Sequence, residues 1–331
     1  MKRVTVIGDG GWGTALALIA RRNGHAVTVW GPFPDYLREI AARGENLRYL
    51  PGIPLPPDIR WEPDRDAAVR SADAVILAVP SPFFAGVVRA FAGAIPAAAA
   101  VVSVTKGLDR DTHRRMTEVA GALLGRGDLC ALSGPSFAEE VARGLPTAVV
   151  AASRDPAAAE AAQRLLRGPV FRVYTTDDVV GVELGGALKN VIALAAGISD
   201  GLGFGSNTKA ALATRGLAEM ARLGRALGAR AETFAGLSGM GDLMLTCTGR
   251  LSRNRAVGER IGRGEPLSAI LSGMCQVAEG VANCANARAL AADAGVTMPI
   301  ADAVHAILHE GRPPLDAVRE LMGRDPRPER D

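Results

Sequence analysis

The sequence predicts an α/β domain with a mostly parallel sheet, followed by an all-α domain. Short β-branched runs alternate with helical patterns from residue 3 to about residue 174, which is typical of consecutive βαβ units. After Tyr174 the strand pattern disappears and only helical patterns follow. We therefore expect a sheet domain over residues 1–180, a helical domain over residues 181–323 and a charged tail over residues 324–331.

The strands are predicted from apolar runs, whose near-continuous apolarity indicates burial on both faces of the sheet. The clearest runs are Val4–Ile7, Val27–Trp30, Ala74–Val79, Val101–Thr105, Leu129–Leu132 and Thr147–Ala152. The stretch Leu50–Pro57 contains four prolines and is predicted to be a loop. In the second domain the helical pattern covers residues 178–197, 207–227, 253–263, 279–294 and 299–309.

Composition excludes several classes of function. The 331 residues include 38 Lys and Arg against 35 Asp and Glu, so a net charge of +3 offers no broad basic field for nucleic acid or a membrane surface. No apolar run is long enough for a signal peptide or a membrane span. The four cysteines lack the spacing of metal ligands and the density of a disulfide scaffold. We expect a cytoplasmic protein with reduced thiols.

The first predicted strand leads directly into a glycine-rich turn. The run Gly8-Asp9-Gly10-Gly11-Trp12-Gly13 matches GxGxxG and opens a helix that begins with Thr14-Ala15-Leu16-Ala17. Gly8 permits the tight turn, Gly10 lets the backbone approach a pyrophosphate, and Gly13 lets the helix lie close to the sheet. The helix N-terminus presents free N–H groups to the phosphates. This context predicts a Rossmann-type domain that binds NAD or NADP.

The second predicted strand bears on the choice between these two cofactors. It ends at Trp30 without the carboxylate that binds a ribose 2′-hydroxyl in a strict NAD enzyme. The next acidic residue is Asp35, and Arg38 could contact a 2′-phosphate, although a solvated helix position is the better explanation of it. The preference stays open and leans towards NADP or dual use.

Six strings combine glycines with polar and charged residues in an unusual way. They are GDGGWGTALA at 8–17, VTKGL at 104–108, SGPSFAEEVARGLPTA at 133–148, GVELGGALKNVIALAAGISDGLGFG at 181–205, GLSGMGDLMLTCTGRLSRNR at 236–255 and QVAEG at 276–280. In this order, over nearly the whole chain, they resemble bacterial NAD(P)-dependent glycerol-3-phosphate dehydrogenases. The resemblance implies reversible NAD(P)H-dependent reduction of dihydroxyacetone phosphate to sn-glycerol 3-phosphate, for glycerophospholipid synthesis.

Lys106 follows a predicted strand, at the sheet edge where open α/β sheets bind ligands. A surface lysine at a strand exit is the alternative interpretation, but only four lysines occur in the chain. The resemblance implies that Lys106 contacts both substrate and cofactor.

The next sheet-to-helix junction contains Gly134 and Ser136. Ser136 with Glu139 three residues later forms a capping-box pattern, which predicts a helix start. The resemblance implies that Gly134 and Ser136 face the substrate and that Ala138 faces the cofactor.

Lys189 is the candidate acid and base. Gly185 and Gly186 lie inside a strong helical pattern, where each glycine costs about 1 kcal/mol relative to alanine, so we expect close approach of a backbone or ligand there. Lys189 and Asn190 follow as candidate substrate-binding residues, and Lys189 shares roughly one helical face with the glycines. Partial burial would lower the pKa of Lys189 towards the range useful for proton transfer. A buried structural lysine is the alternative.

Asp242 is the candidate partner of Lys189. Glycines precede it in Gly239-Met240-Gly241, so backbone can approach closely, and its carboxylate could position the lysine and favour its charged form. The alternative is an aspartate that caps the following helix. In the family the matching residues are a catalytic lysine and a substrate-site aspartate.

The run Ser252-Arg253-Asn254-Arg255 supplies hydrogen-bond donors and positive charge at a predicted helix start. Taken alone it is typical of a solvated helix end, but its place after TCT matches the phosphate-binding segment of the family. The resemblance implies that Ser252, Arg253 and Asn254 bind substrate and that Arg253 also touches the cofactor. Further implied cofactor contacts are Gly11, Trp12, Pro32, Val277 and Glu279, although the family commonly has serine at position 11 and a basic residue at position 32.

Two rival functions remain open. A related hydroxyacid dehydrogenase acting on another small anion would keep the glycine turn and a catalytic lysine. A non-catalytic dinucleotide sensor would keep the turn alone. His305 and His309 lie four residues apart, as metal ligands can, but no further ligand string accompanies them and we expect no metal. The expected partner is a small phosphorylated three-carbon substrate, and a homodimer is an open alternative to a monomer.

Overall fold

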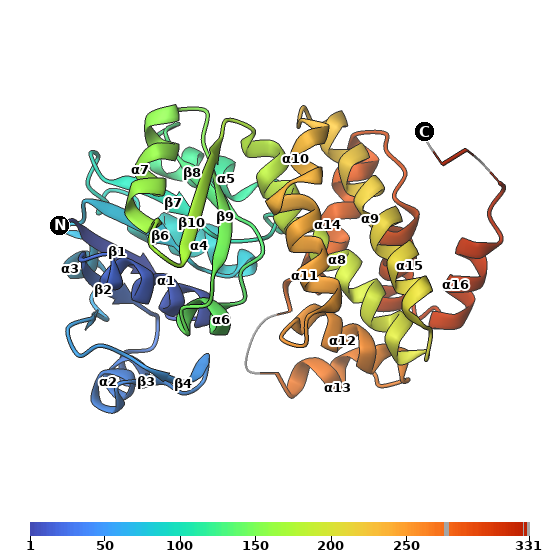
Figure 1. Ribbon diagram of the computed structural model, residues 1–331, viewed down its shortest axis with the longest axis horizontal. Helices are drawn as coiled ribbons and strands as arrows, with labels where there is room; N and C mark the ends of the chain where they lie inside the picture. Colours follow the sequence, from blue (N-terminus) through green and yellow to red (C-terminus); the bar gives the residue numbers. More distant parts are fainter. Residues whose placement is uncertain (275–277, 327, 330–331) are drawn as a thin grey trace.

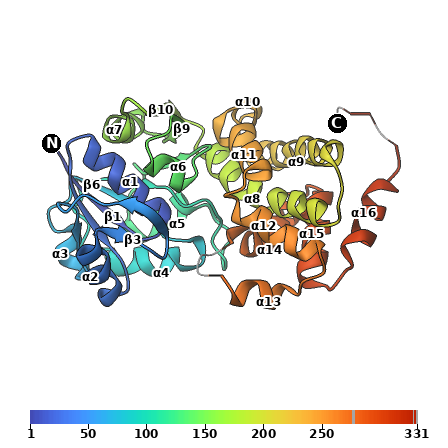
Figure 2. The same ribbon diagram turned by 60° about the horizontal axis from the view of Figure 1, so that its bottom comes forward.

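The computed structural model describes residues 1–274, 278–326 and 328–329, and it divides into a sheet domain and a helical domain that lie side by side (Figures 1 and 2). The predicted fold class is confirmed. The strands are β1 (Arg3–Ile7), β2 (Ala26–Trp30), β3 (Glu45–Asn46), β4 (Leu50–Pro54), β5 (Arg60–Trp61), β6 (Ala74–Leu77), β7 (Ala100–Ser103), β8 (Cys130–Ser133), β9 (Thr147–Ala152) and β10 (Phe171–Thr176).

Helices follow the strands of the first domain and then make up the second. The first set is α1 (Gly11–Arg22), α2 (Pro34–Arg43), α3 (Arg65–Val69), α4 (Ser81–Phe91), α5 (Met116–Leu124), α6 (Ala138–Ala142) and α7 (Pro156–Leu166). The second set is α8 (Val179–Gly201), α9 (Ser206–Ala226), α10 (Ala231–Ala235), a π-helical turn (Leu237–Gly241), α11 (Asp242–Thr248), α12 (Arg253–Gly262), α13 (Leu267–Ser272), α14 (Glu279–Asp293), α15 (Pro299–His309) and α16 (Pro314–Met322).

The main sheet has the strand order β10-β9-β8-β7-β6-β1-β2-β5. Every neighbouring pair is parallel except β8 and β9, which run antiparallel. Apolar side chains of α1, α2, α6 and α7 pack on one face, and those of α3, α4 and α5 pack on the other. Because the sheet is buried on both faces, its strands consist of nearly continuous apolar residues. The sheet holds the carboxyl ends of β7 and β8 towards the helical domain (Figure 1).

The strand predictions were wrong or incomplete at β3, β4, β5 and β10, none of which was identified from the sequence. Leu50–Pro54, predicted to be a loop, forms β4 and pairs antiparallel with β3 in a separate two-stranded sheet. Proline is tolerated there because β4 has a neighbour on one side only. Phe171–Thr176 was not identified as a strand, although its first four residues alternate between buried and exposed, as expected of a strand at the sheet edge beside β9.

Helix α8 forms the centre of the helical domain, and most of its residues are buried. Its length and apolar composition would be sufficient to cross a membrane, but 94% of its most apolar 18-residue segment is buried inside the protein. Helix α12 crosses it very closely, because a Cβ on Gly197 would lie 2.0 Å from the carbonyl oxygen of Arg255 and a Cβ on Gly258 would lie 2.1 Å from that of Leu194. These glycines bring the start of α12 against the middle of α8.

Candidate active site

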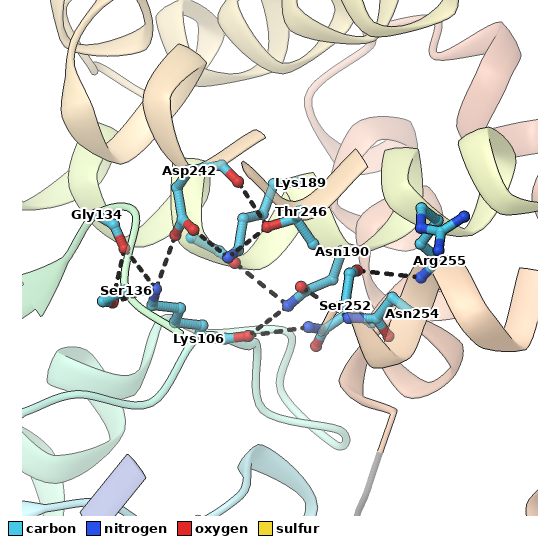
Figure 3. A network of polar contacts seen from close by, with 12 residues as sticks. Lys106, Gly134, Ser136, Lys189, Asn190, Asp242, Thr246, Ser252, Asn254 and Arg255 are labelled. Atoms are coloured by element: carbon cyan, nitrogen blue, oxygen red, sulfur yellow. Dashed lines mark hydrogen bonds and ion pairs between the residues drawn. The ribbon is translucent and has the colours of Figure 1, made fainter. Parts of the chain in front are cut away.

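Polar side chains from both domains meet between the carboxyl ends of β7 and β8 and the helices α8, α11 and α12 (Figure 3). Lys106 follows β7, while Gly134 and Ser136 follow β8. Lys189 comes from the middle of α8 and Asp242 is the first residue of α11. Residues separated by more than a hundred positions therefore form one contact network.

The two glycines of α8 allow this approach. A Cβ on Gly185 would lie 2.4 Å from the carbonyl oxygen of Ser238, and one on Gly186 would lie 2.7 Å from Ser133 Oγ and 3.4 Å from Cγ of Lys106. The close approach expected from the sequence is thus confirmed. Gly185 admits the π-helical turn that precedes Asp242, and Gly186 admits the Lys106 side chain.

Asp242 is 1% exposed and its carboxylate is shared by two lysines. Lys189 Nζ lies 2.5 Å from Oδ1, and Lys106 Nζ lies 2.8 Å from Oδ2. The alternative of an aspartate that caps its own helix is wrong, because Gly241 is the N-cap of α11 and makes no side-chain cap bond. Each carboxylate oxygen instead accepts a charge-assisted hydrogen bond, which is the stronger kind.

Lys189 is a buried lysine with a lowered pKa. Only 6% of its surface is exposed, and its pKa is lowered to about 8. Burial is the largest cause and the charge of Lys106 acts in the same direction, while Asp242 opposes both effects. Lys189 also donates to Thr246 Oγ1 at 3.0 Å, and that hydroxyl donates to the Asp242 carbonyl at 2.6 Å. An ammonium held in this way can release and regain a proton near neutral pH.

The Lys106 side chain extends along the loop after β8. Its Nζ donates to the Gly134 carbonyl at 2.8 Å and contacts Ser136 Oγ at 3.3 Å. The capping box expected at Ser136 is wrong, because α6 begins at Ala138 with Phe137 as its N-cap, and Ser136 Oγ instead donates to the Gly134 carbonyl at 2.9 Å. Ser136 therefore keeps its hydroxyl at the crevice.

A chain of amides fixes the backbone of Lys106. Asn190 Nδ2 donates to the Lys106 carbonyl at 3.2 Å, and Asn254 Nδ2 donates to Asn190 Oδ1 at 2.9 Å. Asn283 was not identified from the sequence, yet its Nδ2 donates to the same carbonyl at 3.3 Å and its Oδ1 accepts the backbone N–H of Leu108 at 3.1 Å. No local pattern marks an asparagine whose partners lie 175 or more residues away.

The start of α12 has the features expected of an anion site. Ser252 is its N-cap and accepts the backbone N–H of Arg255. The side chain of Arg255 turns away to Asp200 at 2.8 Å, whereas Arg253 is exposed. Asn254 uses its Oδ1 to accept the backbone N–H of Gly280 at 2.9 Å. The free backbone N–H groups of the first turn and the Arg253 guanidinium remain to meet an anion.

The glycine turn fits a dinucleotide. Gly8 has φ +122°, and a Cβ on Gly13 would lie 2.1 Å from the Gly8 carbonyl, so the helix packs as expected. Nothing lies within 4 Å of a Cβ on Gly10, which leaves the backbone open to a ligand. Gly11 is held against the Tyr49 carbonyl, and Trp12 Nε1 is buried without a hydrogen-bond partner among the described residues. A free donor beside an open helix N-terminus matches a pyrophosphate or ribose ligand.

The remaining candidate residues lie both at the sheet and beside the lysine cluster, where the charges of Arg253, Lys189 and Lys106 act on the carboxyl of Glu279. Pro32 lies just after β2, and Ala138 begins α6 near Gly11. Glu279 begins α14 and accepts the backbone N–H of Ser81 at 3.3 Å, and burial raises its pKa. Val277 lies outside the described residues. His305 contacts Arg288 and Glu310 through Nδ1, and no group of three His, Cys, Asp or Glu side chains able to hold a metal occurs in the described part of the chain.

Comparison with known proteins identifies relatives over the whole chain. Residues 3–159 match the family described as NAD-dependent glycerol-3-phosphate dehydrogenase N-terminus, and residues 178–319 match the corresponding C-terminus. The glycerol-3-phosphate dehydrogenase (NAD(P)+) of Geobacter metallireducens is 51% identical over 332 residues, with 99% of each chain covered. The crystal structure of glycerol-3-phosphate dehydrogenase from Coxiella burnetii superposes with a TM-score of 0.94 at 42% identity, covering 98% of this chain and 99% of that one. A ketopantoate reductase from Ralstonia eutropha, at 16% identity and a TM-score of 0.64, shares the fold alone.

Proposed function

Because this chain belongs to the NAD-dependent glycerol-3-phosphate dehydrogenase family, we infer that the network around Lys189 is the active site of this oxidoreductase. The enzyme catalyses the reversible NAD(P)H-dependent reduction of dihydroxyacetone phosphate to sn-glycerol 3-phosphate. The observation that carries the site assignment is the buried Lys189, which shares Asp242 with Lys106 and has a pKa near 8.

Lys189 acts as the proton donor in reduction. A nicotinamide coenzyme bound at the glycine turn would supply the hydride for reduction and accept it in the reverse direction. Negative charge that builds on the carbonyl oxygen is neutralised by the proton of Lys189 Nζ, so the ketone becomes an alcohol. In the reverse direction the neutral amine of Lys189 takes the hydroxyl proton. Asp242 orients this amine and keeps enough of it protonated at neutral pH.

Lys106 and the loop after β8 position the substrate. Lys106 Nζ has a carbonyl, a hydroxyl and a carboxylate around it, so it places a second positive charge beside the reacting oxygen. Gly134 and Ser136 line the same edge, and Asn190 holds the Lys106 backbone in place. These are positioning and charge-stabilising roles, which leave the proton transfer itself to Lys189.

The phosphate of the substrate binds at the start of α12. The backbone N–H groups of this ten-residue helix carry the positive end of the helix dipole, and Ser252 fixes the first turn. Arg253 adds a guanidinium that suits phosphate, and desolvation by the surrounding protein lowers its pKa while the charge of Glu279 opposes this. Asn254 holds the helix against Asn190. Gly8, Gly10, Gly11, Trp12, Gly13 and Pro32 hold the cofactor at the sheet, with Ala138 beside Gly11. Lys106, Arg253 and Glu279 contact the cofactor from the cleft, and the contact implied for Val277 lies outside the described residues.

A substrate panel tests this assignment. We expect kcat/KM for dihydroxyacetone phosphate to exceed that for dihydroxyacetone by about a thousandfold, because a site built for a phosphate leaves buried or charged donors unpaired when the phosphate is missing. Initial rates of coenzyme oxidation measure both, with ketopantoate as the probe of the rival hydroxyacid activity. Equal rates for the phosphorylated and unphosphorylated ketone would reject the phosphate site, and no turnover of any ketone would favour the dinucleotide-sensor alternative.

The wider role follows from the product. sn-Glycerol 3-phosphate is the backbone of glycerophospholipids, so we place the enzyme in lipid biosynthesis, in the cytoplasm. We propose residues 1–180 as the dinucleotide-binding domain, residues 181–323 as the helical substrate and catalytic domain and residues 324–331 as a charged tail, with Lys106, Gly134 and Ser136 meeting the substrate from the first domain. The homodimer stays a proposal that light scattering of the purified protein can check.

A further inference from the structure

Asp9 is a buried acidic residue that the catalytic scheme does not use. It stands between Gly8 and Gly10 of the glycine turn and is only 6% exposed. Its Oδ2 atom has no hydrogen-bond partner among the described residues. A buried carboxylate oxygen without a donor is unfavourable, so a donor from outside the chain is expected to complete it.

The carboxylate of Asp9 lies at the end of the neighbouring strand β2. Gly31 is the first residue after β2, and a Cβ there would lie 2.5 Å from Cγ of Asp9, 2.7 Å from Oδ2 and 2.9 Å from Oδ1. Any other residue at position 31 would therefore displace this carboxylate. In dinucleotide-binding α/β domains the end of the second strand is where an acidic residue meets the adenosine ribose. Here the acidic group is present at that place, but it comes from the glycine turn.

The surroundings hold Asp9 in position. Asn46 Nδ2 donates to the Asp9 backbone carbonyl at 2.8 Å, and Asn46 Oδ1 accepts the Tyr36 hydroxyl at 2.6 Å. Burial raises the pKa of Asp9, and the charge of Arg48 opposes this rise. Arg48 is exposed and its guanidinium stacks over the Tyr36 ring at 4.1 Å. Arg48 and Arg38 are candidates for attracting a 2′-phosphate to this corner, but Arg38 pairs with Asp35 and the charge of Arg48 acts on Asp9.

We propose that Asp9 accepts a hydrogen bond from the adenosine ribose 2′-hydroxyl of the coenzyme and thereby makes the protein prefer NADH to NADPH. This inference rests on the proposed function only in taking the glycine turn as the coenzyme site. A 2′-phosphate would meet the Asp9 carboxylate and be repelled, whereas a 2′-hydroxyl would supply the missing donor. The lack of an acid at the end of β2 suggested NADP or dual use, and Asp9 reverses that expectation. Asp35, the next acid along the chain, is 94% exposed and pairs with Arg38.

Coenzyme binding without substrate is the test. Dissociation constants for NADH and NADPH are measured from the fluorescence of the reduced nicotinamide. We expect NADH to bind the wild-type protein at least about thirtyfold more tightly than NADPH, since a hydrogen bond to a charged acceptor is gained in one case and like charges meet in the other. Asp9→Ala should weaken NADH about tenfold and reduce the discrimination to about threefold or less. Asp9→Asn should strengthen NADPH binding, because it removes only the charge.

Asp73→Asn is the matched control: Asp73 also lies in the sheet domain and pairs with Arg3 at 3.0 Å, and its loss should leave the ratio of the two dissociation constants unchanged. Equal binding of both coenzymes by the wild-type protein would overturn the proposal. An unchanged ratio in Asp9→Ala would also overturn it. If the melting temperature without coenzyme falls while the ratio stays the same, the role of Asp9 is structural. The substrate assignment is tested separately: if no ketone phosphate is reduced while the coenzyme ratio responds as expected, the reaction is wrong and Asp9 keeps its role.

Discussion

Lys189→Met is expected to reduce kcat for dihydroxyacetone phosphate reduction by about a thousandfold or more while NADH still binds. General acid catalysis by a positioned group contributes about 10²- to 10⁴-fold, and the second contribution of Lys189, its positive charge beside the carbonyl oxygen, is lost at the same time. The coenzyme turn lies on the sheet domain, so its dissociation constant should change less than about threefold. Steady-state rates and a fluorescence titration measure the two effects on the same preparation.

Lys209→Met is the control for this change. Lys209 is also a lysine of the helical domain, and it pairs with Asp200 at 2.7 Å away from the Lys106–Asp242 network. Its loss should alter kcat by no more than about twofold, because partly exposed ion pairs contribute little. If Lys189→Met retained a tenth of the wild-type turnover, another group would have to be the proton donor.

Asp242→Asn is expected to have the next largest effect, a loss of about a hundredfold in kcat/KM at neutral pH. The substitution leaves Lys189 and Lys106 facing each other without the carboxylate that separates their charges. Asp242 raises the pKa of Lys189 and Lys106 lowers it, so this pKa should fall below about 8 in the variant. Less of Lys189 is then protonated at neutral pH, and its amine is also less well oriented. The descending limb of the pH profile should move towards acid.

Glu183→Gln provides a matched control for the loss of a buried carboxylate. Glu183 lies on the same helix α8, is 6% exposed and pairs with Arg115 at 2.7 Å. Breaking such a buried pair costs about 3–5 kcal/mol of stability, so both variants should melt at lower temperature. Only Asp242→Asn should move the pH profile. A profile that stays in place in Asp242→Asn, or that moves equally in Glu183→Gln, would show that Asp242 supports the fold and leaves the chemistry to other residues.

The sequence predicted those parts of the molecule that depend on local chemistry. The glycine turn was recognisable because strand, glycines and helix are contiguous, and the cost of Gly185 and Gly186 within a helix pointed to the close approach that brings Lys106 to Lys189. The antiparallel direction of β9 and the presence of the edge strand β10 were not predicted, since strand direction and pairing depend on distant partners. The local pattern at Ser136 also predicted a capping box that does not form, because helix α6 starts at Ala138 with Phe137 as its N-cap.

Residues whose roles arise only from tertiary contacts could not be predicted. Asn283 donates a hydrogen bond to the backbone carbonyl of Lys106, which lies 177 residues earlier in the sequence. Thr246 links Lys189 to the backbone of Asp242. The sharing of Asp242 by two lysines likewise requires α8, α11 and the end of β7 to be placed together (Figure 3). Asp9 is present in the motif itself, but its significance depends on Gly31 and on the burial of Oδ2.

The central claim is that Lys189 gives up the proton in ketone reduction, and the pH dependence of the wild-type enzyme tests it most directly. Burial places the pKa of Lys189 at about 8 in the free enzyme, and kcat/KM reports free-enzyme groups. For reduction, kcat/KM should therefore be level near pH 7 and fall about tenfold per unit above about pH 8, because the protonated form is lost. For oxidation it should rise up to about pH 8 and then level off. A profile for reduction that stays level to pH 10 would contradict the account.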